Sequence, residues 1–505
     1  MSTAQRVIKN TGWLYAKMGI TMFISLYTTR LILNSLGAAD FGIYNVVGGA
    51  IAMLGFINAA MASTTQRFLN YNEGAGDSER QKRIFNVSIV LHISIAIVIG
   101  ILLAAAGLIF FNGVLNIPSE RLFAAKTVYR CMIVSTLLTV ISVPYDACLN
   151  AHENMRYYAV VGILESVLKL AVAFVCVYTL KDKLIVYGIL MAVIPLITLS
   201  IMSVYCHRHY QECELAPVKY YSKSIMLEMS GFAGWSFLTT VTSMLTQYGL
   251  GVVLNSFYGV VMNAAHGIAN QVSGMLMAFS SNAQKAFNPV LVKSEGAGDR
   301  ERLKYVSFFG CRISFYIFGI FSLPMIFLAP EILKIWLKDV PVWAVAFTRL
   351  QLLRTLLEQI TLSMTMAVLA EGHIKHYAIV RSVWYILPLL IVPVLFHYNC
   401  SPLWMYFVWI FCWCIAGGWV IIKCCKTNLG FQPSEYLKKV LSPCFIVTLI
   451  SCCPYIISFC VNGSTPTRLL VTLLSEFMFV ALGFMYIVDK AERAKIISIV
   501  RNLRR

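Results

Sequence analysis

Long apolar runs separated by short polar segments dominate this chain. About fourteen of these runs contain roughly 20 residues, which is long enough for a helix to cross the hydrocarbon core of a bilayer. Their centres lie near residues 24, 51, 98, 138, 169, 195, 242, 270, 318, 356, 388, 412, 450 and 478. The pattern predicts an all-α polytopic membrane protein with about 14 transmembrane helices.

An eight-residue string occurs twice, each time at the polar end of an apolar run. EGAGDSER occupies residues 73–80 and EGAGDRER occupies residues 295–302, and residues 127–161 align without gaps on residues 346–380. The repeated segments indicate two bundles of six helices each. Because six is an even number of spans, the second bundle begins on the same side of the membrane as the first, so the repeat is parallel and its pseudo-two-fold axis runs along the membrane normal. We expect four parts in the chain: an N-terminal bundle (1–206), a cytoplasmic linker (207–229), a C-terminal bundle (230–424), and two extra transmembrane helices with a basic cytoplasmic tail (425–505).

The repeated string has the composition of a turn. Its glycines favour a tight turn, and an aspartate at the start of a helix is a preferred N-cap. We therefore expect Asp77 and Asp299 to cap the helices that follow them. The string lacks the lysine and the preceding strand of a phosphate-binding loop, and the chain holds no G-x-x-x-x-G-K-[ST] motif, so ATP is not expected as its direct energy source.

The composition agrees with a protein embedded in lipid. Hydrophobic residues make up 59% of the chain and charged residues 13%, with a mean hydropathy of +0.73, whereas soluble proteins carry about 25% charged residues. If the N-terminus is inside, the inner segments hold 27 of the 41 Lys and Arg residues and the outer segments hold 7. This bias predicts that both termini are cytoplasmic. The net charge of +18 then faces the anionic cytoplasmic leaflet, so no nucleic-acid partner is expected.

The cysteines and histidines do not form a recognisable motif. The fifteen cysteines lie mostly within apolar runs or on the cytoplasmic side, so a disulfide framework is not expected. Cys412 and Cys414 lack nearby histidine partners, and His152 and His373 are interpreted as solvated loop residues. We expect no metal site and no cofactor.

Ionisable groups inside the apolar runs are the candidate functional residues. A basic residue at a helix centre costs roughly 2.5–3.5 kcal/mol, so such residues usually face a cavity or a partner. Glu165 and Lys169 lie one helical turn apart, as do Arg354 and Glu358, and Asp146 lies near an inner helix end. Each pair is either a neutralised packing contact or part of a water-filled cavity in which the carboxylates couple transport to an ion. Lys17 lies near the cytoplasmic surface, where snorkelling of its side chain is sufficient explanation.

Three further arginines have no acidic neighbour one turn away. Arg130 and Arg349 occupy equivalent positions in the two copies, and Arg30 lies at similar depth. Each could snorkel to outer headgroups. The alternative is an electropositive cavity between the halves, with Arg354 and Lys169 as further cations, that binds an anionic headgroup. Guanidinium groups suit this role because they stay charged and can bind phosphate oxygens through two parallel hydrogen bonds.

Several segments resemble a known family. LYTTRLILNSLGAADFGIYNVVGG at residues 26–49, STTQRF, the EGAGD string and PYDACLNAHENM at residues 144–155 are similar to the polysaccharide-type Wzx flippases of the MOP superfamily. The most specific element is L-G-x-x-D-[FY]-G-x-Y, from Leu36 to Tyr44, in which Gly37 and Gly42 suit a tight turn between the first two helices.

The resemblance implies a transporter of the bacterial inner membrane rather than an enzyme. Such flippases move undecaprenyl-pyrophosphate-linked oligosaccharide, a unit of O-antigen, lipopolysaccharide or capsule, from the cytoplasmic to the periplasmic leaflet. They are V-shaped pairs of bundles that rock between two states, and they have a cationic cavity. The implied partners are the lipid-linked oligosaccharide, the bilayer, H+ or Na+ as coupling ion, and the glycan polymerase machinery.

Three alternatives stay open on the sequence. A MATE-type drug antiporter shares the implied fold but often uses an acidic residue in its first helix, where this chain has Lys17 and Arg30. A lipid II flippase also has fourteen helices and a cationic cavity. An oligosaccharide polymerase or ligase would need a large periplasmic loop, and the loops here are short.

Overall fold

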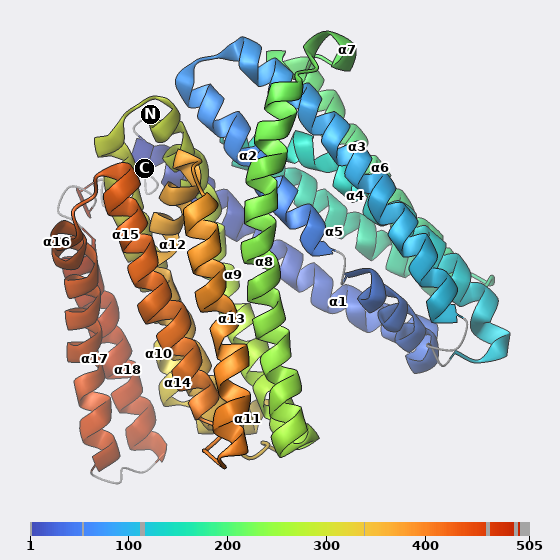
Figure 1. Cartoon of the computed structure of the whole chain (residues 1–505). Helices are drawn as coiled ribbons and strands as arrows, with labels where there is room; N and C mark the ends of the chain where they lie inside the picture. Colours follow the sequence, from blue (N-terminus) through green and yellow to red (C-terminus); the bar gives the residue numbers. More distant parts are fainter. Residues whose placement is uncertain are drawn as a thin grey trace, which may run out of the picture. The chain divides into compact units, whose positions relative to one another are not determined.

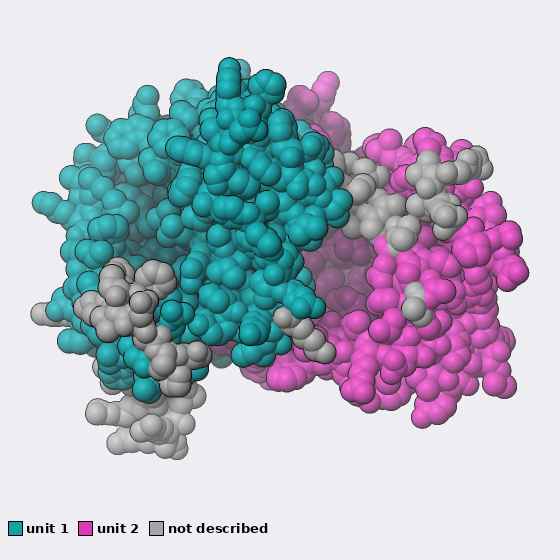
Figure 2. All heavy atoms as spheres, turned by 90° about the horizontal axis from the view of Figure 1, so that it is seen from below, with its two compact units in different colours: residues 1–9, 238–505 teal, residues 10–237 magenta. Residues whose placement is uncertain are grey.

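The structure is a computed structural model that describes residues 3–52, 55–111, 117–337, 339–460, 465–488 and 493–494. Every regular element within these residues is a helix, which confirms the all-α prediction. The chain forms two compact units, coloured separately in Figure 2. We call residues 10–237 the N-terminal unit and residues 1–9 with 238–505 the C-terminal unit.

The described helices include eleven that are long and apolar enough to cross a membrane. Each of the eleven contains one of the predicted centres. The other three centres fall on two helices: those near 24 and 51 on α1 (Thr3–Ala52), and that near 270 on α9 (Val260–Gly296). The α9 helix carries many polar residues for a span, among them Asn263, His266 and Asn270. The polytopic class is thus confirmed, and the number of about 14 stays a prediction.

The N-terminal unit is built around α4. Its helices after α1 are α2 (Gly55–Ala75), α3 (Ser78–Ile109), α4 (Leu122–Ala151), α5 (Met155–Tyr178), α6 (Lys183–His209) and the short α7 (Pro217–Tyr220). The α4 helix packs against α2, α3 and α6. Small residues allow this close approach: Ala124, Ala125 and Val128 are almost fully buried against Ile99 and Leu103.

The C-terminal unit is centred on the mutual packing of α9, α10 and α12. Its elements are α8 (Lys223–Tyr258, which begins in the N-terminal unit), α9, α10 (Arg300–Phe327), α11 (Ala329–Leu337), α12 (Ala344–Glu371), α13 (Lys375–His397), α14 (Trp404–Ile410), α15 (Gly417–Leu429), α16 (Pro433–Tyr436), α17 (Ser442–Cys460) and α18 (Thr465–Leu482). The last two helices lie side by side (Figure 1), and α18 also packs on α10. Hydrogen-bonded polar side chains join the three central helices: Gln284 donates to both Ser314 and Ser363.

Both copies of the repeated string form the same turn. Gly76 and Gly298 each have φ +73°, a left-handed conformation that glycine adopts at little cost. Asp77 then accepts a hydrogen bond from the backbone N–H of Arg80 at 2.9 Å, and Asp299 accepts one from Arg302 at 3.0 Å. The predicted tight turns and N-caps are therefore confirmed.

A tight turn was predicted at Gly37 and Gly42, and the structure has a break in the helix at Gly37 only. Gly37 has φ 80° and interrupts α1, and Gly259 interrupts the path from α8 to α9 with φ 83°. Gly42 lies in regular helix, so the expectation of a turn there was wrong. A single residue with positive φ is sufficient to break the helix, and the chain resumes α-helical geometry directly after Gly37.

Candidate functional site

A small polar pocket within the N-terminal unit is lined by four helices, and three of them, α1, α4 and α5, supply ionisable side chains. Its volume is about 140 Å³, and its lining includes Lys17, Ser142, Asp146, Tyr158, Glu165 and Thr198. The Lys17 ammonium lies 4.1 Å from the centre of the Tyr158 ring, a cation–π distance. The structure thus brings two of the predicted ion-coupling carboxylates, Asp146 and Glu165, to one pocket. Lys17 lines this pocket rather than simply reaching toward the headgroups.

A glycine makes room for the lysine in this pocket. A Cβ built on Gly162 would lie 2.2 Å from Lys17 Cε and 2.5 Å from its Nζ. Any larger residue at position 162 would therefore displace the ammonium from the pocket. The predicted Glu165–Lys169 pair also forms, with 2.6 Å between Oε1 and Nζ. Both of its side chains are about two-fifths exposed, so the pair is partly solvated.

A second charged cluster lies inside the C-terminal unit. Arg354 donates to Glu358 at 2.5 Å, as predicted from their spacing. Its guanidinium carbon lies 4.2 Å from the centre of the Trp409 ring and 5.4 Å from that of Trp413. The Arg354 side chain is only 6% exposed and that of Glu358 is 24% exposed. The arginine is therefore fixed by one ion pair and two aromatic faces, while its carboxylate partner keeps some access to solvent.

Arg381, which was not among the predicted site residues, joins this region. It lies on α13, which begins at Lys375, and it is 5% exposed. Its Nη1 donates to the Trp413 carbonyl at 3.0 Å, and its guanidinium lies 4.4 Å from the centre of the Tyr385 ring. A Cβ on Gly417 would come within 1.5 Å of Nη1, so this arginine, like Lys17, lies against a glycine.

The register of the duplication could have pointed to Arg381. Residues 127–161 align with residues 346–380. The next residue after each aligned segment is Gly162 in the first copy and Arg381 in the second, so these two positions correspond. In the first copy that glycine accommodates a lysine from another helix, and in the second copy the same position carries the cation itself. Both units therefore hold a basic group at a corresponding place, supplied by different helices.

The remaining predicted arginines occupy two kinds of environment. Arg30 on α1 and Arg130 on α4 are exposed. Arg349 is half-buried and binds the end of α10: its Nε donates to the Ile326 carbonyl at 2.9 Å, and Nη2 lies 3.5 Å from the Phe327 carbonyl. A cation at a helix C-terminus is favoured by the helix dipole. Arg349 thus has a structural contact that the sequence did not reveal.

An apolar cavity of about 570 Å³ lies within the C-terminal unit, beside α12. Its wall is formed by side chains of several helices and of the segment that leads into α17, among them Leu357, Ile360, Trp384, Ile415, Leu437 and Leu441. A cavity of this size and lining suits an apolar ligand.

The chain was compared with known proteins. A family model described as "Polysaccharide biosynthesis protein" matches residues 7–295. The uncharacterized membrane protein EpsK of Bacillus subtilis (strain 168) is 23% identical over 323 residues, which is 63% of each protein, so the chain spans less than two thirds of that relative.

Solved structures share the fold. A crystal structure of MATE in complex with MaL6 covers 87% of this chain and 98% of its own at 13% identity and a TM-score of 0.71. An outward-facing multidrug resistance MATE family transporter of the MOP superfamily covers 86% of this chain and 98% of its own, at 14% identity and a TM-score of 0.72. A MOP superfamily transporter from Pyrococcus furiosus, whose binding pocket is described as having reverse polarity, covers 86% of this chain and 98% of its own, at 14% identity and a TM-score of 0.70.

Proposed function

This chain belongs to the polysaccharide biosynthesis protein family, and we propose that it flips an oligosaccharide linked to undecaprenyl pyrophosphate from the cytoplasmic to the periplasmic leaflet of a bacterial inner membrane. The coarser part of this statement, a multi-pass membrane protein with the fold of MOP-superfamily transporters, follows from its eleven apolar helices and its structural neighbours. The substrate and the mechanism are the proposal.

The observation that carries the proposal is an excess of positive charge inside the C-terminal unit. Arg354 and Arg381 are both about 95% buried on membrane-spanning helices. Among their described contacts, Glu358 supplies one negative charge against these two cations. Two guanidinium groups with one carboxylate favour an anionic ligand such as pyrophosphate and disfavour a cationic drug.

We assign contacts with the pyrophosphate to Arg30 and Arg130 as well, because these side chains are exposed and could reach a headgroup on its way to the periplasmic leaflet. Arg349 keeps its place in the predicted set, but its bonds to the end of α10 lead us to expect a contribution to stability as well as to binding. The headgroup would cross by alternating access while the polyprenyl tail stays in lipid.

Ion coupling is assigned to the pocket of the N-terminal unit. Asp146 and Glu165 line it together with the hydroxyl groups of Ser142 and Thr198. A carboxylate can take up H+, and carboxylate and hydroxyl oxygens together can bind Na+. The positive charge of Lys17 would stabilise the carboxylates after the ion has left and so favour its release. In the C-terminal unit Glu358 is the remaining candidate, because it is the more exposed member of its pair.

The predicted topology belongs to the same proposal. We retain an N-in/C-in protein with about 14 helices, two repeated bundles and an appendage formed by α17 and α18. The shared turn at Gly76 and Gly298 and the shared break at Gly37 and Gly259 support the repeat. The apolar cavity beside the start of α17 supports a role of the appendage in holding the polyprenyl tail.

Deletion of the gene in its own bacterium separates the proposed function from its alternatives. We expect loss of surface glycan, accumulation of lipid-linked oligosaccharide in the inner leaflet, and rescue by the wild-type gene. Normal glycan with raised sensitivity to cationic dyes would instead identify a drug antiporter. Cell lysis with arrested wall synthesis would identify a lipid II flippase.

A further inference from the structure

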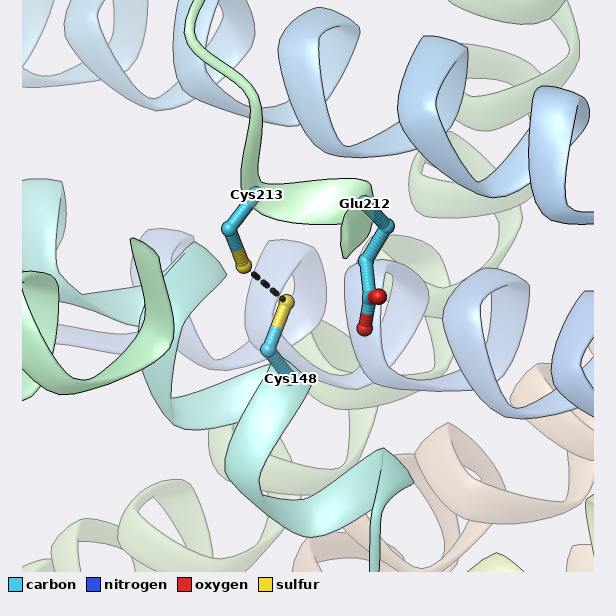
Figure 3. A group of neighbouring side chains, drawn as sticks. All are labelled: Cys148, Glu212 and Cys213. Atoms are coloured by element: carbon cyan, nitrogen blue, oxygen red, sulfur yellow. Dashed lines mark hydrogen bonds between the residues drawn. The ribbon is translucent and has the colours of Figure 1, made fainter. Parts of the chain in front are cut away.

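Three side chains with metal-binding atoms meet within the N-terminal unit, outside the polar pocket (Figure 3). Cys148 lies in the last turn of α4, and Glu212 and Cys213 belong to the short 3-10 helix Gln211–Cys213 (η3), which follows α6. The two Sγ atoms are 3.6 Å apart, and the two sulfurs and a Glu212 carboxylate oxygen all lie within 4.8 Å of one another.

The group is buried and includes a third thiol. Cys148 is 0% exposed, Cys213 is 1% exposed and Glu212 is 7% exposed. A third thiol, Cys206 in the last turn of α6, is also 0% exposed and lies near Cys213; it donates to the Tyr145 carbonyl at 3.8 Å. Buried thiols alone are often packing groups. A carboxylate buried next to three of them is different, because burying a charge is costly unless a partner compensates it.

His152 holds this carboxylate in place. Its Nε2 lies 2.5 Å from Glu212 Oε1, and its Nδ1 lies 3.5 Å from Glu73 Oε1, in the first copy of the repeated string. The imidazole also stacks on Tyr210, with ring centres 3.9 Å apart. His152 is therefore not a solvated loop residue, contrary to the sequence-based expectation. Among the contacts described for His152, one imidazole therefore faces two carboxylates.

We propose that Cys148, Cys213 and Glu212 bind a zinc-class divalent cation, with His152 as the group that orients Glu212. Sulfur atoms bound to one zinc at about 2.3 Å with tetrahedral angles lie about 3.8 Å apart, close to the separation of the two thiols here. Thiolate and carboxylate ligands suit such an ion, and a carboxylate that binds a metal is commonly held in orientation by a hydrogen bond such as that from His152.

The site would join three segments that are distant in sequence. The η3 helix opens the connection from α6 to α8, Cys148 belongs to α4, and Glu73, in the last turn of α2, contacts the cluster through His152. A bound cation would fix the beginning of this connection to the helices of the N-terminal unit. Its role is structural and does not depend on the transported substrate.

The test uses the full-length protein purified in detergent with an affinity tag that contains no histidine. Zinc is added, excess metal is removed, and the bound metal per chain is measured by elemental mass spectrometry. Cobalt is then used as a spectroscopic probe of thiolate coordination. The variants are Cys213→Ser and His152→Ala, and the matched control is Cys412→Ser, another buried cysteine that lies in the C-terminal unit.

We expect about one zinc per chain and a sulfur-to-cobalt charge-transfer band in the wild type and in Cys412→Ser. Cys213→Ser should lose both signals, and His152→Ala should weaken zinc affinity by about 10–100-fold. Wild-type protein that retains no zinc, or that shows no thiolate band with cobalt, would overturn the proposal whether or not the variants fold. A Cys148–Cys213 disulfide in the protein purified from cells with a reducing cytoplasm would overturn the proposal as well.

Discussion

Replacing Arg354 by methionine tests whether the charged cluster of the C-terminal unit is both a stabilising pair and part of the transport site. The Nη1 and Oε1 atoms of Arg354 and Glu358 are 2.5 Å apart, and the arginine side chain is only 6% exposed. Removing one partner of a buried ion pair costs about 3–5 kcal/mol, because the other charge loses its main compensation; Arg381, which also interacts with Glu358, does not replace the direct contact. We therefore expect Arg354→Met to be much less stable than the wild type.

The double variant Arg354→Met/Glu358→Gln separates the ion pair from the other contacts of the arginine. Neutralising Glu358 removes the uncompensated charge, so most of the lost stability should return. The remaining deficit should be about 2 kcal/mol, the value of a desolvated cation–π contact such as that with Trp409. In apparent Tm, measured by size exclusion after heating in detergent, the single variant should fall by roughly 3–5 °C and the double variant by about 2 °C, because the unfolding entropy of a 505-residue chain is about 1 kcal/mol per kelvin.

Two results would refute this reasoning. If the single and double variants unfold at the same temperature, Glu358 does not depend on Arg354 for its compensation. If the stable double variant restores full surface glycan in the deletion strain, the pair has no part in transport. We expect the double variant to be present in the membrane at nearly normal levels and still fail to display glycan.

Two further predictions concern packing and pH. Gly417→Ala should displace Arg381 from its hydrogen bond with Trp413 and lower stability by about 2 kcal/mol. The control is Gly418→Ala, whose Cβ would meet only Thr361 at an ordinary distance of 3.5 Å and which should be nearly neutral. The apparent Tm of the two variants checks this prediction. Asp182 is partly buried, which opposes its ionisation, but hydrogen bonds from Arg121 and from the start of α6 prevail and lower its pKa below its usual value of 3.8. The stability that this carboxylate contributes is present above pH 3.8 and is lost as pH falls further. Asp182→Asn should therefore have a lower Tm than the wild type at pH 7, and an equal deficit at pH 3 would contradict the assignment.

What could be predicted from the sequence is mostly what depends on local spacing. The caps at Asp77 and Asp299 follow from an aspartate placed before a helix, and the pairs Glu165–Lys169 and Arg354–Glu358 follow from the period of the α-helix. These contacts lie within one turn of helix or one loop. They do not depend on which distant segments come together.

The features that were missed depend on tertiary packing. Cys148 and Cys213 are 65 residues apart, and their spacing matches no metal-binding motif, so only the packing of η3 on α4 brings them together. The bonds of Arg349 to the end of α10 could not be predicted, because they depend on how α12 passes that end. Arg381 was not singled out because charged residues at the edge of an apolar run do not reveal where a helix begins.

The most direct test of the account is the flipping of a defined lipid in proteoliposomes. Oligosaccharide linked to undecaprenyl through pyrophosphate or through a single phosphate is placed in the vesicles, and its exposure is followed with an impermeant lectin. We predict that the wild type flips the pyrophosphate lipid faster, that Arg30→Ala and Arg381→Ala abolish this preference, and that Arg83→Ala, which removes an exposed cation from the start of α3, leaves it intact. Equal rates for both lipids in the wild type, or an unchanged preference in both arginine variants, would contradict the claim that intramembrane arginines bind the pyrophosphate.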